Sequence, residues 1–545
     1  MKNKLIWLLG LSVVLTACDV DNTIDPIEEP VVPEVALSAG SANFSKYVAI
    51  GASFTAGFTD GALFKASQGN SFPNIMSKKF AMANGGTFTQ PLMNDNIGGF
   101  LIGGTQFGAP RFYFNGTGPV RLNAAPTTEI GVVQAGPYSN MGVPGMKSFH
   151  LGVQGYGALA ALPNANPYFI RMASAPTASV LQDALAQSPT FFSISEIGGN
   201  DVLGYAIGGG VGVDQANNFN PATYGPEDIT SPVVFNQVFG QTVDLLTAGG
   251  AKGIVANIPY VTSLSYFTTV PYAPLDPSNP AFGPQIPTLN TVFGALNQIF
   301  MNPAINQPNR VIVFKTTEAN PVVIRDESLV NLSAQITGGL LASPQFPAFV
   351  QSFGLPAQAA PLVASLLGNY YGQARQATAD DLLVLPSSGI IGTINTNSVA
   401  FLMSQGLSQQ LAGMFSAEGV SLPLEDKWVL TADEVSKVKT ATDAYNATIK
   451  ATATAKGLAF VDFKAILQEA STTGIATDDF VLTTGFVTGG LISLDGIHLT
   501  ARGYAVMANK MLEAIDEAYG SNFTKATSGL AKVGNYPTHY NPALR

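Results

Sequence analysis

The segment Tyr47-Val-Ala-Ile-Gly-Ala-Ser-Phe-Thr-Ala-Gly57 joins an apolar run to a turn that carries a serine between two glycines. A short apolar run of this kind is typical of a buried parallel strand, and the turn after it lies at the carboxyl edge of the sheet. Comparable runs follow at residues 190–197, 253–258, 310–315 and 458–462. Stretches long enough for helices separate them, which predicts an α/β protein with a central parallel sheet.

Two helices are marked by signals at their ends. Thr431-Ala-Asp-Glu434 is a capping box, and Gly457 ends the apolar pattern that follows it. The last helix is expected to begin at Thr500 and to end at Gly520. The residues expected to face inward are Val435, Val438, Tyr445 and Ile449 in the first helix, and Tyr504, Met507, Met511 and Ile515 in the second.

Two long segments lack the alternation of strands and helices, and we predict that they are insertions in one domain spanning residues 46–520. Residues 60–140 and 265–430 are rich in Gly, Pro and Asn, and we interpret them as insertions that lie over the sheet. Within the second insertion, the apolar pieces at 340–341 and 362–367 are expected to form its own core in preference to a site for an acyl group. Residues 521–545 form a polar tail.

The composition excludes several classes of protein. The chain has 545 residues, with 26 basic and 36 acidic side chains and a net charge of −10. A surface of this charge cannot neutralise a run of phosphates, so no nucleic-acid partner is expected. A single cysteine excludes a disulfide framework and a cysteine-rich zinc site, and no metal or other cofactor is expected.

That cysteine lies at the end of an N-terminal leader. Lys2 and Lys4 precede a short apolar stretch, and Leu15-Thr-Ala-Cys18 resembles a bacterial lipobox. Residues 1–17 are then a signal peptide, Cys18 is lipidated, and the acidic, proline-rich residues 18–45 form a tether. A signal peptide with an incidental cysteine is the alternative. The lipobox predicts a membrane partner reached through a lipid anchor in the cell envelope, with the outer membrane of a Gram-negative bacterium as the expected location.

Asp495 and His498 form the first candidate catalytic pair. They lie three residues apart across a turn that contains Gly496, so the carboxylate can reach one ring nitrogen. A carboxylate there fixes the tautomer and leaves the other nitrogen as a base. An aspartate that caps its own turn beside a surface histidine is the alternative.

Ser53 is the candidate nucleophile. Its turn follows the first apolar run, and a serine at the carboxyl edge of a sheet needs a base, which His498 can supply. The alternative is a serine that caps a helix. Gly57 is four residues after Ser53, so the spacing differs from the elbow of α/β-hydrolases.

Two glycine-rich turns offer donors to an oxyanion. Gly145 ends Asn140-Met-Gly-Val-Pro-Gly145, and Asn200 lies in Glu196-Ile-Gly-Gly-Asn-Asp. A backbone N–H and a side-chain amide suit this role, although ordinary left-handed turns contain the same residues. His150 and Asp201 are interpreted as packing and turn residues. The acidic pairs Asp326-Glu327 and Asp380-Asp381 are interpreted as solvated turns.

The order of these motifs resembles that of the SGNH (GDSL-type) hydrolase family over about residues 46–520. The resemblance implies a flavodoxin-like three-layer α/β/α sandwich with a central parallel sheet. It also implies a triad of Ser53, His498 and Asp495, with an oxyanion hole made by the N–H groups of Ser53 and Gly145 and the side chain of Asn200. The family usually has Gly-Asp-Ser, whereas Ala52 replaces the acid here.

The expected function is therefore that of a lipid-anchored serine esterase, a carboxylic ester hydrolase that works through an acyl-enzyme. Its substrate is a small-molecule, lipid or acylated-carbohydrate ester, and the sequence does not distinguish among them. The alternative is a glycan-binding envelope lipoprotein, inactive or weakly active, on the same fold, which Ala52 leaves open.

Overall fold

The computed structural model describes residues 35–545, so the signal peptide and Cys18 lie outside the described residues. The centre of the molecule is a five-stranded sheet with the order β6-β1-β7-β8-β13, in which every neighbouring pair is parallel. Its strands are β1 (Tyr47–Gly51), β6 (Asn140–Gly142), β7 (Phe191–Ile194), β8 (Lys252–Ala256) and β13 (Ala459–Val461). All residues of β1, β6 and β7 are buried, as expected when helices cover both faces.

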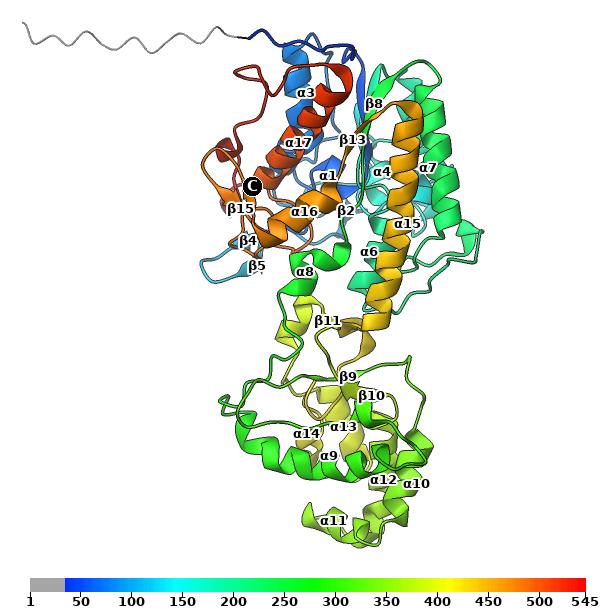
Figure 1. Cartoon of the computed structure of the whole chain (residues 1–545), viewed down its shortest axis with the longest axis vertical. Coiled ribbons are helices and arrows are strands. Elements are labelled where there is room, and N and C mark those ends of the chain that lie inside the picture. Colours follow the sequence, from blue (N-terminus) through cyan, green and yellow to red (C-terminus); the bar gives the residue numbers. More distant parts are fainter. Residues whose placement is uncertain (1–34) are drawn as a thin grey trace, which may run out of the picture.

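Helices cover the sheet on both faces (Figure 1). On one face lie α6 (Asn200–Ile207), α7 (Pro232–Thr247) and α15 (Ala432–Lys456), and on the other lie α3 (Phe72–Met82) and α17 (Ala501–Tyr519). The short helix α16 (Phe463–Thr472) follows β13 directly. The molecule is thus a mixed α/β protein, compatible with a three-layer α/β/α arrangement.

In the order in which the chain visits them, the strands lie 2-1-3-4-5 across the sheet. The chain extends the sheet to one side of β1 with β6 and then returns to the other side with β7. This reversal is the topological switch point, and loops at the carboxyl ends of the two flanking strands leave a crevice there. The loops after β1 and β7 are therefore the places where a site is expected.

The two helices marked by their ends are confirmed. Thr431 and Glu434 form the capping box of α15, and Thr500 caps α17 by accepting the N–H of Gly503. Gly457 and Gly520 end these helices with φ of 62° and 70°, a left-handed conformation that glycine adopts without strain. All eight residues predicted to face inward are buried.

Four of the five predicted strands are confirmed as β1, β7, β8 and β13, but the prediction at 310–315 is wrong. Arg310 ends a 3-10 helix, and residues 311–315 pair with no strand within residues 35–545, because side-chain amides of α9 (Ile286–Phe300) bond to their backbone groups. Asn297 accepts the N–H of Ile312, and Asn290 accepts the N–H of Phe314, both at 2.9 Å. The fifth strand is β6, whose three residues were too few to show a pattern.

Residues 60–140 contribute to the main domain as well as covering it. Helix α3 packs against α17 and belongs to one of the helical layers. The remainder contains α2 (Lys65–Gly69) and two hairpins, β2 (Leu101–Ile102) with β3 (Thr105–Gln106) and β4 (Phe112–Phe114) with β5 (Pro119–Arg121). Two short helices, α4 (Pro167–Ile170) and α5 (Val180–Ala186), precede β7.

Most of residues 265–430 form a separate lobe with its own hydrophobic core, which includes Leu340 and Leu367 (Figure 1). The buried Arg310 stabilises the lobe by donating to the carbonyls of Val330, Tyr371 and Gly372. Besides α9 its helices are α10 (Ser333–Ala342), α11 (Phe346–Ser352), α12 (Ala360–Tyr371), α13 (Thr396–Ser404) and α14 (Gln409–Met414). Its strands β9 (Val323–Arg325) and β10 (Ala374–Gln376) pair, and α8 (Ser265–Thr268) and the pair β11 (Leu382–Leu383) and β12 (Val429–Leu430) lie toward the main domain.

The C-terminal tail packs back onto the main domain. The fully buried Arg111 donates to the carbonyls of Asn541 and Leu544, which fixes the end of the chain. A small hairpin of β14 (Ile475–Ala476) and β15 (Val481–Leu482) precedes α17. Between residues 35 and 545, no helix combines the length and the apolar character needed to cross a membrane.

Candidate active site

Ser53 lies where β1 ends, as the first residue of the one-turn helix α1 (Ser53–Ala56). The helix ends at Gly57, whose N–H bonds to the carbonyl of Ser53 and whose φ is 88°. Ser53 does not cap this helix, because the capping position belongs to Ala52. Within residues 35–545 the hydroxyl of Ser53 has no hydrogen-bond partner, and the residue is 8% exposed. The hydroxyl is therefore available to a ligand.

Asp495 and His498 are in direct contact. Oδ2 of Asp495 lies 2.9 Å from Nδ1 of His498, while Oδ1 accepts the backbone N–H groups of Ile497 and His498. Burial alone raises the pKa of the Asp495 carboxyl, but His498 and these N–H donors outweigh it and hold that pKa well below its usual value. The carboxylate is therefore charged, and it holds the ring with Nδ1 toward itself, so that Nε2 remains for chemistry.

A loop from the start of the domain supports this pair. The N–H of Gly61 donates to Oδ2 of Asp495 at 2.8 Å, and Thr59 donates to the carbonyl of Leu499. Asp60 is buried with φ of 52°, and its Oδ1 accepts the N–H of Leu494. Burial raises the pKa of Asp60 to about 7. These contacts join the loop after α1 to the turn that carries the histidine.

Aromatic rings restrict the orientation of His498. The ring of Phe58 lies 4.6 Å from the imidazole and that of Phe54 lies 5.5 Å from it, measured between centroids. Both residues follow Ser53 closely in the chain. The side chain of His498 is only 12% exposed.

Asn200 contacts the residue next to Gly145. Asn200 is the first residue of α6, and its Nδ2 donates to the carbonyl of Met146 at 3.0 Å, which leaves one amide hydrogen for a ligand. Gly145, next to Met146, has φ of 79°, and its N–H has no partner among residues 35–545. A side chain here would be strained by that φ, although only the amide of Asn166 lies near.

The structure brings the candidate nucleophile, the candidate base and one candidate oxyanion donor to the same pocket. Ser53, Asn200 and His498 all line it. Asp495 lies behind His498, and Gly145 is linked to the pocket through Met146 and Asn200. The candidate residues thus come from the loops after β1, β6 and β7 and from the turn before α17.

Glu196 is the residue that the sequence did not reveal. Its Oε1 accepts the N–H groups of Ala52 and Thr55 at 2.7 and 2.8 Å, on either side of Ser53. Its other oxygen is buried and has no partner in the part of the chain that the structure describes, and burial raises the pKa of the carboxyl to about 7. A side chain at Gly51 would collide with Oε1, so the glycine admits this acid. The only local signal was an acid directly after an apolar strand.

The other polar residues singled out in the sequence have structural partners. His150 stacks on Tyr156 with a centroid distance of 4.5 Å, and burial lowers its pKa to about 4. Asp201 accepts the N–H and the hydroxyl of Ser148, so its carboxylate ties down another loop and not its own turn. Asp326 and Asp381 both form ion pairs with Arg375, so these two acids are not solvated turns.

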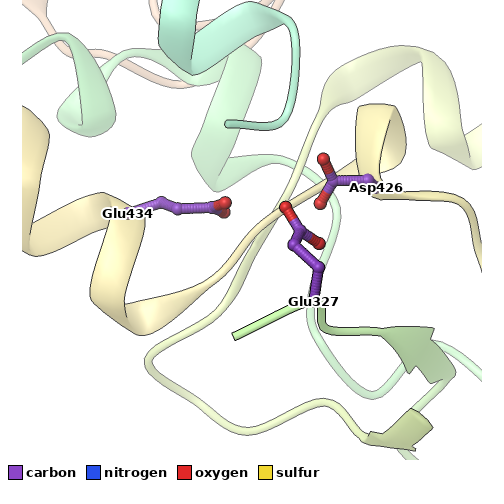
Figure 2. A group of neighbouring side chains, drawn as sticks. All are labelled: Glu327, Asp426 and Glu434. Atoms are coloured by element: carbon purple, nitrogen blue, oxygen red, sulfur yellow. The ribbon is translucent and has the colours of Figure 1, made fainter. Parts of the chain in front are cut away.

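A cluster of three carboxyl groups, apart from the candidate active site, lies where α15 begins. Glu327, Asp426 and Glu434 point toward one another, with oxygens within 4.8 Å (Figure 2). Burial and the neighbouring carboxylates raise the pKa of Asp426 to about 8 and that of Glu434 to about 7. The raised pKa values of Asp426 and Glu434 favour their protonated forms, which reduces the repulsion within the group.

Comparison with known proteins gives no relative. No family model, no curated protein and no solved structure matches the chain.

Proposed function

We propose that this protein is a lipid-anchored serine esterase of the SGNH type, built on a flavodoxin-like sheet. The observation that carries the proposal is the 2.9 Å contact between Asp495 and His498 beside the pocket that also holds Ser53. A charged acid, an oriented imidazole and a serine hydroxyl are the three parts of a nucleophilic triad. Ser53 and His498 line the same pocket, although no hydrogen bond joins them within residues 35–545. The strand order, with the site at the switch point, supports the same assignment.

In this mechanism Nε2 of His498 takes the proton of the Ser53 hydroxyl as its oxygen attacks the ester carbonyl. The developing oxyanion accepts hydrogen bonds from the N–H groups of Ser53 and Gly145 and from the remaining amide hydrogen of Asn200. His498 then gives its proton to the leaving alkoxide, and an acyl-enzyme remains. Water attacks this ester by the reverse sequence of proton transfers, releasing the carboxylic acid and restoring Ser53.

Glu196 supplies a carboxyl group to the turn in which Ala52 replaces the acid of the family motif. The resemblance implies an acid at position 52 as a supporting residue. Here the carboxyl group of Glu196, from the loop after the neighbouring strand β7, contacts the same turn. The turn that carries Ser53 therefore keeps a carboxyl acceptor. This favours a working esterase over an inactive glycan-binding protein on the same fold.

The cellular part of the proposal rests on the sequence. The lipobox at Cys18 supports a lipid anchor, and the acidic residues that follow it support a domain held away from the bilayer. The last part of the predicted tether packs on the main domain instead, because Phe44 is buried in its core and the N–H of Ser41 donates to the carbonyl of Tyr519. Outer-membrane attachment in a Gram-negative envelope belongs to the same proposal.

Labelling with a fluorophosphonate tests the nucleophile. The label should be found on Ser53, and Ser53→Ala should abolish labelling and reduce kcat by about 10⁶-fold. Ser195→Ala is the matched control, because Ser195 is also buried and lines the same pocket. A label on Ser195, or undiminished hydrolysis by Ser53→Ala, would contradict the proposal.

A further inference from the structure

The pocket that contains Ser53 continues beyond the catalytic residues into an apolar channel. Its cavity volume is about 110 Å³. Apolar side chains form most of its lining, and many of them come from α6, α16, α17 and the loop after β8. They include Leu203, Ile258, Val261, Phe463, Ile466 and Met507.

Helix α17 gives the direction and length of this channel. His498 lies just before the helix, and Gly503, Val506, Met507 and Lys510 line the pocket from one helical face. At 1.5 Å per residue, the stretch from Gly503 to Lys510 covers about 10 Å. The pocket therefore extends along the helix, away from the catalytic histidine.

The polar side chains of the lining fall into two groups. Ser53, Ser195, Glu196, Asn200 and His498 lie at the catalytic end, and Asn257 and Lys510 already have partners within the described residues. The amide of Asn257 donates to Asp462 at 2.7 Å and accepts the N–H of Lys464 at 3.0 Å. Lys510 pairs with Glu513 at the far end. A sugar buried here would lose hydrogen bonds to water without replacing them, whereas a hydrocarbon chain would lose none.

We propose that this channel binds the acyl chain of the substrate, and that the substrate is an ester of a medium- or long-chain fatty acid. This inference rests on the proposed esterase function and names the substrate class for the same site. When Ser53 attacks, the carbonyl carbon lies beside Asn200 and the hydrocarbon chain runs between α6, α16 and α17.

Two ester series separate the acyl chain from the alcohol. In p-nitrophenyl esters from acetate to octanoate, kcat/KM should rise by about fourfold for each buried methylene, and by at least about 100-fold across the series. In acetate esters of alcohols of increasing length, the rise should be absent. A rise only in the alcohol series, or in neither series, would overturn the proposal.

Substitution in the channel supplies a second test. Leu203→Trp and Ile466→Trp should each lower the ratio of kcat/KM for octanoate to that for acetate by at least about tenfold, because the indole fills the channel. Ile207→Trp, on the exposed part of α6 and outside the pocket, should leave the ratio unchanged. An unchanged ratio in both channel variants, with fluorophosphonate labelling retained, would contradict the proposal.

The labelling result shows whether a negative outcome contradicts only the acyl channel or also the esterase function. If Ser53 is labelled and acetate is cleaved without chain preference, the channel assignment is wrong and the esterase stands. If Ser53 is not labelled and no ester is cleaved, both are wrong.

Discussion

Replacing Glu196 tests whether its carboxyl group holds the turn that carries Ser53. In Glu196→Ala the N–H groups of Ala52 and Thr55 lose their acceptor, since Oε1 accepts both. Each buried donor left without a partner costs about 1–3 kcal/mol, so the free energy of unfolding should fall by about 2–6 kcal/mol. The turn should also shift, and kcat should fall with it.

Glu196→Gln keeps an oxygen acceptor but removes the titration. The carboxyl pKa is raised from 4.5 to about 7, so the folded state binds this proton more tightly than the unfolded chain does. The wild-type protein therefore loses stability as pH rises from about 4.5 through about 7. Gln does not ionise, so the variant should match the wild type near pH 4 and exceed it at pH 8 by at most about 3 kcal/mol.

Urea unfolding at pH 4 and pH 8, together with kcat, measures both effects. Glu469→Gln, at an exposed position of α16, is the control and should change neither stability nor its pH dependence. A stability difference between Glu196→Gln and the wild type that does not vary with pH would refute the argument about the buried proton. Unchanged stability and kcat in Glu196→Ala would refute the role of the acceptor.

Three further predictions concern other parts of the chain. Asp495→Asn should lower kcat by about 10⁴-fold with little change in KM, because an amide favours the wrong tautomer of His498; steady-state kinetics measures this, and a loss confined to KM would contradict it. Asp426→Asn should raise Tm relative to the wild type, and by more at pH 9 than at pH 5. The reason is that the raised pKa of this carboxyl makes the wild type lose stability as the pH rises over that interval. Equal shifts of Tm at both pH values would contradict this prediction. Cys18→Ser should move the protein from the membrane fraction to the soluble fraction, as immunoblotting of fractionated cells would detect, and unchanged fractionation would count against the lipobox.

The sequence predicted those features that depend on local signals. Apolar runs of four or more residues gave β1, β7, β8 and β13, and a capping box and terminal glycines gave α15 and α17. The short β6 has no such pattern, because its middle residue alone is a large apolar one. The segment at 310–315 did have the pattern, but Asn290 and Asn297 of a neighbouring helix satisfy its backbone, which no local rule anticipates.

The same distinction applies to the candidate site. Ser53, Asn200 and the pair Asp495 and His498 lie in short motifs, so their residue types and spacing could be interpreted directly. Glu196 acts through the backbone of a loop 144 positions earlier in the chain, and this contact depends on the pairing of β1 with β7. The apolar channel is assembled from several separate elements, so no single stretch of sequence carries its pattern.

The position of the inserted lobe explains how so large an addition leaves the site intact. The serine and the histidine come from opposite ends of the domain, and hydrogen bonds between the loop after α1 and the segment around α17 hold them together. Tyr504 donates to the carbonyl of Phe58 at 2.6 Å, and Thr59 donates to that of Leu499 at 2.8 Å. The lobe leaves the main domain after α8 and returns before α15, so it passes through neither segment. These contacts lie in the main domain, and the insertion adds one of its own at the turn that carries His498, where the N–H of Tyr266 donates to the carbonyl of Gly496 at 2.9 Å.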